Sequence, residues 1–402
     1  MELFIARQPI FTVNLRVFAY ELLYRGSSSF SLTDNESDRA TANVLSSTFL
    51  TEGIDRISDN KPCFINFTRN LLLKKLPATF PSSQVIIEVL EDVPPTPDVI
   101  AVCKELKHAG YTIALDDFIF DPKLLPLVEI ADIIKFDCLL SPIETLLPTL
   151  KKLEPYKLKY LAEKVETHEM FEKAKRFGFS YFQGYFFRKP EQIGIREVST
   201  AKANLVNLLT EVNRSATTLK ELEQIISRDV GLTYKLLRYI NSSYFYRLHK
   251  IESIKHAIAY LGTRDLKKFI TLVIISELAT DKPSELVRTA LIRARFLEIL
   301  ATEAGEPENA EKLFLLGLFS LLDAILGMKM EYISGRLPLG EELKQALISR
   351  KGRLGSFFNV LLNCEDHDRN GCIDALQIID VQPARIGPMY LEAITFSQSI
   401  LA

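Results

Sequence analysis

The residue that most clearly points to chemistry in this sequence is Glu88, a carboxylate in the middle of the apolar run QVIIEVLE at 84–91. Burying a lone carboxylate is costly, or it shifts the pKa of the group until the group is neutral. We therefore expect cationic groups beside Glu88. Other short apolar runs also carry an acid, an amide or an amine near their C-terminal ends, and these polar residues are Glu21, Asn66, Asp116, Asp117, Lys135, Asp137, Glu163, Glu166 and Gln183.

The spacing of these polar residues predicts the architecture that would bring them together. The leading residues of successive runs are 45, 22, 28, 19, 28 and 20 positions apart, and most gaps hold a helical-looking segment, as at 37–50, 96–110 and 167–178. Strand, helix and strand at this spacing form a parallel sheet with covered faces. Seven or eight such units most simply close into a modified TIM-type (β/α) barrel, whose active site lies at the C-terminal ends of the strands.

Composition limits the class of protein and its partners. The chain has 402 residues, is 47% hydrophobic and 25% charged, and carries a net charge of −2. These values predict a soluble protein of two domains, without the basic surface that binds DNA. The start of the sequence lacks the layout of a signal peptide, and the most apolar window, 313–328, is shorter than a membrane span and contains Asp323. We expect a cytoplasmic protein that does not bind membranes.

The pattern of the chain changes near residue 198. Residues 1–197 hold the strand signals of the barrel, whereas residues 198–402 show helical periodicity in segment after segment. Several glycines fall where these helices would end, and they are Gly262, Gly305, Gly327 and Gly352. The sequence therefore predicts a barrel domain followed by an all-α domain.

Seven motifs of the first domain, taken in order, resemble the EAL family of cyclic di-GMP phosphodiesterases. The family's Glu-Ala-Leu stands here as Glu21-Leu22-Leu23. No single motif is specific, but the order and rough spacing match across nearly the whole domain. The motifs are YELLYR at 20–25, INFT at 65–68, IEVLE at 87–91, ALDDF at 114–118, IKFD at 134–137, AEKVE at 162–166 and FQGYFF at 182–187.

The resemblance implies a metal-dependent site for cyclic di-GMP. Oxygen ligands favour Mg²⁺ or Mn²⁺, and two such ions can activate water and neutralise charge on a phosphodiester. The resemblance gives a role to each site residue. Glu21, Asn66, Glu88 and Asp116 would bind the first ion, and Asp117 would help to hold a second. Lys135 would steady the phosphate or the water, and Glu163 would act on that water or support the metals. Glu91 would anchor the loop after Asp117, and the pocket would be lined by Arg25, Gln183 and Gln8.

Three departures from the family pattern concern turnover. The family normally continues after its two aspartates with Phe and a flexible Gly-Thr-Gly turn, but here Phe118 is followed by Ile119-Phe120-Asp121-Pro122. The loop has lost its glycines, and proline stiffens what remains. Lys164 replaces the glycine of the Ala-Glu-Gly stretch, and Gly26 replaces an aromatic residue. A complete set of first-metal ligands beside a rewritten loop is typical of a slow enzyme or a former enzyme.

The second domain resembles HDOD, a helical output module related to HD phosphohydrolases. The resemblance lies in ISRDVGLTYKLLRYINSSYF at 226–245, in IESIKHAIAYLGTRDLKKFI at 251–270 and in LGLFSLLDAILG at 316–327. Beyond residue 200 the histidines are too few and badly spaced for the metal site of the catalytic relatives. The resemblance thus implies a non-catalytic module that binds a protein partner.

Two functions from different classes follow from the sequence. The first is a cyclic di-GMP signalling protein that binds the nucleotide through its barrel, and the sequence leaves open whether it hydrolyses the nucleotide slowly or not at all. The alternative is an interaction scaffold that neither binds nor cleaves nucleotide. The retained charges favour the first, while the altered loop and Gly26 favour the second. The sequence is compatible with a homodimer but does not determine the oligomeric state.

Overall fold

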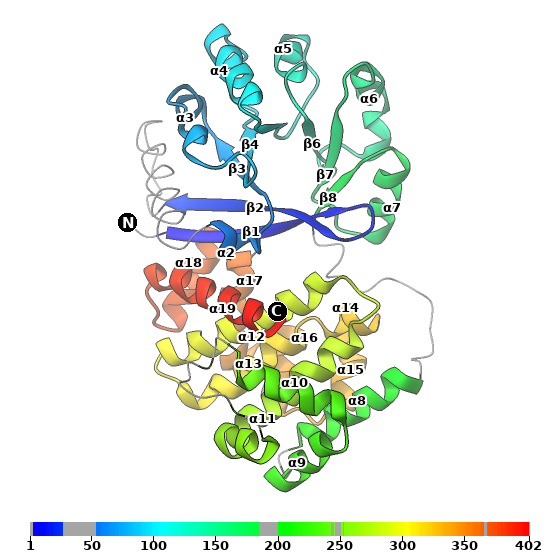
Figure 1. Ribbon diagram of the computed structural model, residues 1–402, viewed down its shortest axis with the longest axis vertical. Helices are drawn as coiled ribbons and strands as arrows, with labels where there is room; N and C mark the ends of the chain where they lie inside the picture. Colours follow the sequence, from blue (N-terminus) through cyan, green and yellow to red (C-terminus); the bar gives the residue numbers. More distant parts are fainter. Residues whose placement is uncertain are drawn as a thin grey trace. The chain divides into compact units, whose positions relative to one another are not determined.

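The computed structural model describes residues 3–26, 54–184, 200–214, 216–242, 245, 251, 253–365 and 368–401. The chain divides into two compact units, Met1–Lys189 and Pro190–Ala402 (Figure 1). The predicted domain boundary at 197–198 lies outside the described residues and stays a prediction. The helix expected at 37–50 also lies outside them.

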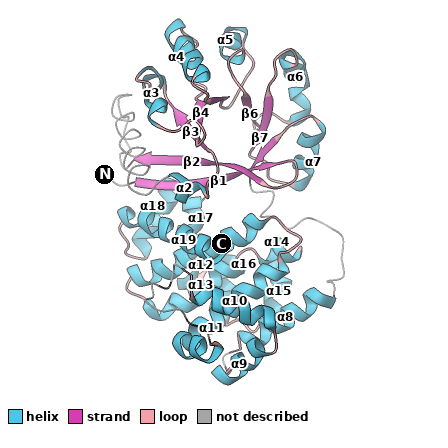
Figure 2. Ribbon diagram, in the orientation of Figure 1, coloured by secondary structure: helices cyan, strands magenta, loops and turns pink. Residues whose placement is uncertain are grey.

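The first unit contains a closed barrel of eight strands in chain order (Figure 2), which confirms the predicted fold class. From β2 to β8, each strand pairs in parallel with the next one in the chain. The strands are β1 (Leu3–Thr12), β2 (Val17–Gly26), β3 (Cys63–Phe67), β4 (Val85–Val89), β5 (Thr112–Leu115), β6 (Ile133–Asp137), β7 (Lys159–Glu163) and β8 (Tyr181–Gln183).

Strand β1 departs from the parallel repeat that the sequence predicts. It runs antiparallel to both of its neighbours, β2 and β8. The turn from Thr12 to Val17 is short and includes Leu15 in a left-handed conformation, φ 55°. A parallel crossover needs a dozen or more residues, so this connection can only form a hairpin. The seven runs of the sequence analysis correspond to β2 to β8, which pair in parallel, and β1 adds an antiparallel strand that closes the barrel.

Short helices connect the strands of the barrel. The segments expected to be helical at 96–110 and 167–178 form α4 (Pro97–His108) and α7 (His168–Arg176), and Thr167 caps α7 by accepting from the backbone N–H of Met170. The remaining helices of this unit are α2 (Ile54–Ser58), α3 (Arg69–Leu73), α5 (Leu125–Val128) and α6 (Leu147–Leu153).

One layer of the barrel interior explains how the site residues are positioned. One buried side chain from each strand joins this cluster, and its members are Ile10, Ala19, Phe64, Ile86, Ala114, Ile133, Leu161 and Tyr181. Side chains on a strand alternate between its two faces, so a residue two positions away points to the same side. Two positions further toward the same rim lie, in strand order, Gln8, Glu21, Asn66, Glu88, Asp116, Lys135, Glu163 and Gln183. The polar side chains therefore form the next layer of the barrel interior, directly above the apolar one.

The second unit is helical, as the sequence predicts. Gly262, at φ 68° and ψ −175°, interrupts the long helix α11 where the sequence predicts a helix end. The helices are α8 (Thr200–Val212), α9 (Leu219–Ser227), α10 (Val230–Ile240), α11 (Ile254–Leu278), α12 (Ser284–Glu303), α13 (Ala310–Phe319), α14 (Leu322–Leu326), α15 (Met330–Arg336), α16 (Glu341–Ser349), α17 (Gly352–Glu365), α18 (Arg369–Ile378) and α19 (Ile386–Leu401).

A buried ion pair ties α12 to α17 within this unit. Arg293 donates to both carboxylate oxygens of Glu365, at 3.0 and 2.6 Å. Such a two-pronged bond gives geometric specificity in addition to charge compensation. The pair has the features of a structural link between two helices.

None of the described helices is by itself both long enough and apolar enough to span a membrane. Among the described residues, one bent pair, Pro307–Leu326 and Met330–Arg336, meets both criteria together, with a bend of 116°.

Candidate functional site

The barrel places the predicted site residues on one rim. Register pairing sets Gln8 opposite Glu21 and Asn66 opposite Glu88. Glu88 is fully buried, and Glu21 and Glu163 are nearly so. Because neighbouring strands lie about 4.8 Å apart, side chains at equivalent heights on the inner face meet at the centre. The sequence-predicted residues of β1 to β8 are thereby brought together.

Lys135 occupies the centre of this rim. Its ammonium bonds to Glu88 and reaches Glu163 at 2.8 Å, Asp116 at 2.9 Å and Glu21 at 3.7 Å. These four carboxylates come from four different strands or strand ends. The cation that the buried position of Glu88 requires is thus Lys135, which lies 47 positions away in the sequence.

The electrostatics of the rim follow from burial and crowding. Burial, and next the charges of Glu21, Asp116 and Glu163, hold the pKa of Glu88 well above its usual value despite Lys135. Burial likewise raises the pKa of Glu163 to about 8, with Lys135 opposing the shift. For Asp116 burial acts in the same direction, but the charge and hydrogen bond of Lys135 outweigh it and lower the pKa. One lysine therefore does not compensate all of these acids.

Two oxygen atoms on the rim suit a metal ion. Asn66 Oδ1 and Glu88 Oε2 are buried and accept no hydrogen bond, although a buried polar atom normally has a partner. Oxygens of Glu21, Glu88 and Glu163 also lie within 4.8 Å of one another. Carboxylate and amide oxygens are the ligand types that Mg²⁺ and Mn²⁺ prefer. The residues present thus fit the divalent ion that the sequence analysis expects.

A second acidic group adjoins the first. Oxygens of Asp116, Asp117 and Glu163 lie within 4.8 Å of one another. Burial, and next the charge of Asp116, raise the pKa of Asp117. The backbone of Asp117 is left-handed, with φ 38°, a strained conformation for a residue other than glycine. Strain of this kind often accompanies function, and here it belongs to the residue expected to hold a second ion.

The glutamines expected to line the pocket form a short chain of hydrogen bonds. Gln183 donates to Gln8 Oε1 at 2.7 Å and to Glu21 Oε2 at 2.6 Å. This chain links β1, β2 and β8 and fixes the orientation of Glu21. The side chain of Arg25, also expected to line the pocket, lies outside the described residues.

The segment after Asp117 is held more firmly than a glycine turn would be. Phe118 is buried, and its N–H donates to the carbonyl of Lys135 at 3.0 Å. Asp121 caps a short turn that contains Pro122, whereas Ile119 is 78% exposed. A cleft of about 230 Å³ lies beside this segment, with Glu91, Asp116, Asp117 and Ile119 among its lining residues. Glu91 makes no hydrogen bond to the segment within the described part of the barrel.

Two residues without an assigned role also lie at this rim. Asp137 Oδ1 accepts from the backbone N–H groups of Leu139 and Leu140, and its Oδ2 accepts from Lys164 at 2.5 Å. Lys164 has φ 54°. The sequence contained a signal for this contact, because Lys164 stands where the family pattern has glycine.

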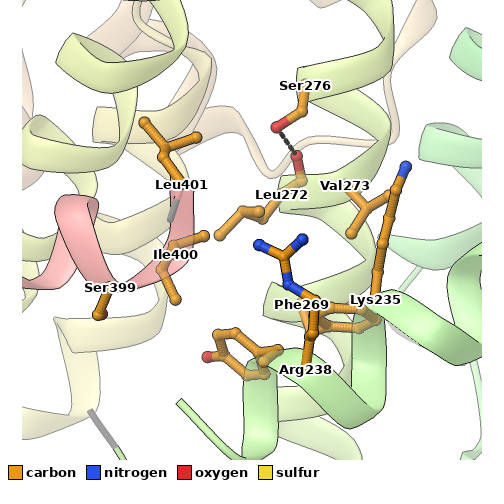
Figure 3. Close-up of a pocket in the computed structure, with 10 residues that line it drawn as sticks. Lys235, Arg238, Phe269, Leu272, Val273, Ser276, Ser399, Ile400 and Leu401 are labelled. Atoms are coloured by element: carbon orange, nitrogen blue, oxygen red, sulfur yellow. Dashed lines mark hydrogen bonds between the residues drawn. The ribbon is translucent and has the colours of Figure 1, made fainter. Parts of the chain in front are cut away.

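The helical unit has a cavity of about 210 Å³ between α10, α11 and the end of α19 (Figure 3). Its walls are mainly apolar, with Phe269, Leu272 and Ile400 among them. Lys235 at its edge is bonded to Glu277 at 2.7 Å, and the Arg238 guanidinium points inward. Its lining residues include no carboxylate, histidine or cysteine.

Comparisons with known proteins agree with this arrangement. A closed barrel with acids on one rim, followed by a helical unit, defines a two-part protein with a TIM-type barrel, and the model of the HDOD domain matches residues 199–330. The chain is 36% identical over 409 residues to the uncharacterized protein YuxH of Bacillus subtilis, covering 100% of this chain and 99% of YuxH. It is 35% identical over 363 residues to the cyclic di-GMP phosphodiesterase CdgJ of Vibrio cholerae, covering 89% of this chain and 83% of CdgJ.

The chain therefore belongs to the EAL–HDOD family, in which an EAL barrel is joined to an HDOD domain. A solved structure with weaker similarity is BlrP1 of Klebsiella pneumoniae in complex with manganese and cyclic di-GMP. It is 24% identical, covers 46% of this chain and 55% of BlrP1, and has a TM-score of 0.39.

Proposed function

We propose that the barrel binds cyclic di-GMP together with Mg²⁺ or Mn²⁺ and hydrolyses it slowly. The observation that carries the proposal is the rim itself. Glu21, Glu88, Asp116 and Glu163 surround Lys135, and three buried rim oxygens, Asn66 Oδ1, Glu88 Oε2 and Gln183 Oε1, accept no hydrogen bond. A chain with no ligand to bind gains nothing from this crowding, because like charges in one site destabilise the fold. Membership of a family that includes a cyclic di-GMP phosphodiesterase supports the same ligand.

Each residue has a distinct role in this proposal. Glu21, Asn66, Glu88 and Asp116 would hold a divalent ion, which supplies a water of lowered pKa and neutralises charge on the phosphodiester. Lys135 would hold the attacked phosphate or the water through its ammonium. Glu163, 2.8 Å from that ammonium, would take the proton that the water loses. Gln183 and Gln8 would orient Glu21 at the pocket wall.

The experiment is a calorimetric titration of the full-length protein with cyclic di-GMP in Mn²⁺ and in EDTA, followed by chromatography of the products. We expect Mn²⁺-dependent binding and slow formation of the linear dinucleotide. Glu163→Gln should keep binding but lose product, because the proton acceptor is gone and the size of the side chain is conserved. Absence of binding under both conditions would favour the alternative, a scaffold that does not recognise nucleotide.

Hydrolysis should be limited by the segment 118–122 rather than by the metal ligands. Misplacing a reacting group by about 1 Å can cost roughly a hundredfold in rate. Replacing the residues after Phe118 with a full-length loop containing Gly-Thr-Gly should therefore raise the hydrolysis rate by about tenfold to a hundredfold, with little effect on nucleotide affinity. Rates of product formation under saturating Mn²⁺ measure the change.

The matched control is the same loop in a Glu163→Gln background, which should stay inactive. If the native protein already cleaves cyclic di-GMP at about 1 s⁻¹ or faster, as efficient enzymes do, then the segment does not limit turnover.

The helical unit would act as a non-catalytic output module that binds a protein partner. Its cavity has mainly apolar walls and one inward-pointing guanidinium, and its lining includes no carboxylate, histidine or cysteine. A homodimer is one arrangement that the proposal accommodates.

A further inference from the structure

Lys164 is the residue next to Glu163, a member of the second acidic group. It directly follows Glu163 at the end of β7, and its backbone is left-handed. Few residues other than glycine adopt this conformation unless their surroundings hold them there. Its ammonium bonds to Asp137 Oδ2 at 2.5 Å, while Asp137 Oδ1 is taken by the N–H groups of Leu139 and Leu140. Both acceptor positions of Asp137 Oδ1 are therefore used, and Oδ2 has the Lys164 ammonium beside it.

The charge of Lys164 acts on the residues of that acidic group. Its hydrogen bond to Asp137 holds the ammonium in place, and the charges of Asp117 and Glu163 act on it. A lysine ammonium is a cation at neutral pH. It stands beside the same Asp117 and Glu163 whose oxygens, with those of Asp116, lie within 4.8 Å of one another.

We infer that Lys164 takes the place of a second metal cation, so that the rim binds one divalent ion tightly and a second only weakly. A second ion here would meet the repulsion of the first ion and of the ammonium. The inference rests on the proposed function, since it presupposes that the first ion binds. The Lys164 side chain is 54% exposed, so solvent and salt screen the repulsion. We therefore expect a weakened second site rather than complete exclusion.

The test is the number and affinity of Mn²⁺ ions bound per full-length chain without nucleotide, from calorimetry and from the electron paramagnetic resonance signal of free Mn²⁺. The wild type and Lys164→Arg, which keeps the charge, should bind one ion tightly. Lys164→Met keeps the length of the side chain and removes the charge, and should bind the second ion at least tenfold more tightly than the wild type. Lys164→Gly, which also relieves the left-handed backbone, should behave like Lys164→Met.

Thermal melting in EDTA identifies which variants fold, and either Lys164→Met or Lys164→Gly suffices for the comparison. Two ions bound by the wild type with similar affinity, or an unchanged second affinity in both neutral variants, would overturn the inference while leaving the proposed function intact. Absence of Mn²⁺ binding in every protein would overturn the proposed function and this inference together.

Discussion

Glu88→Gln should weaken Mn²⁺ binding by about a hundredfold or more, equivalent to roughly 2.7 kcal/mol. The substitution keeps the shape of the side chain but removes its negative charge. Glu88 Oε2 is a buried oxygen that accepts no hydrogen bond and so is free to bind the ion. Divalent ions of this class bind largely through charged oxygens. Calorimetry with Mn²⁺ on both proteins measures the loss.

The same variant should be at least as stable as the wild type in EDTA. Burial and neighbouring acids raise the pKa of Glu88, which means that the charged form of this side chain destabilises the metal-free fold. Glu129→Gln, an exposed carboxylate just after α5, is the matched control and should change neither property. Equal Mn²⁺ affinity in the wild type and Glu88→Gln would show that Glu88 is not a metal ligand.

Lys135→Met should lower the free energy of unfolding of the metal-free protein by about 3–5 kcal/mol, the usual cost of removing one partner from a buried ion pair. Lys135 is 1% exposed and contacts four carboxylates, which the variant would leave without their cation. Urea unfolding in EDTA measures the difference, and Lys104→Met, an exposed lysine on α4, is the control.

The loss in Lys135→Met should depend on pH and on metal. The pKa of Glu163 is about 8 and that of Glu88 is raised even with Lys135 present, and both rise further without it. A carboxyl group whose folded-state pKa is raised stabilises the fold at low pH, and this stability is lost as the pH rises from the unfolded value of 4.5 through the folded value. The variant should therefore be closest to the wild type near pH 5 and furthest from it above pH 8. Added Mn²⁺ should narrow the gap, and a gap that is small and constant with pH would mean that Lys135 does not neutralise these acids.

Much of the rim was predictable from the sequence because strand geometry is local. The seven apolar runs, each with a polar residue near its end, predict strands whose C-terminal ends converge. Alternation along a strand then places Glu88 two positions above Ile86 on the inner face. The helices at α4 and α7 follow in the same way from local periodicity and capping. The identity of the ligand types, and thus the preference for Mg²⁺ or Mn²⁺, needs only the residue names.

Other features depend on contacts between distant segments, which no local pattern encodes. That Lys135 satisfies Glu88 follows from the closing of the barrel, which brings β4 and β6 to one centre. That β1 joins as an antiparallel strand and delivers Gln8 follows from a turn too short for a crossover. The contact of Lys164 with Asp137 requires β6 and β7 in register, with Asp137 opposite Glu163. The sequence by itself determined which side chains reach the rim, because alternation along a strand is a property of a few successive residues. Only the tertiary structure decided which of them are neutralised by a lysine and which oxygens stay free for a metal, because those distances depend on how strands far apart in the chain are paired.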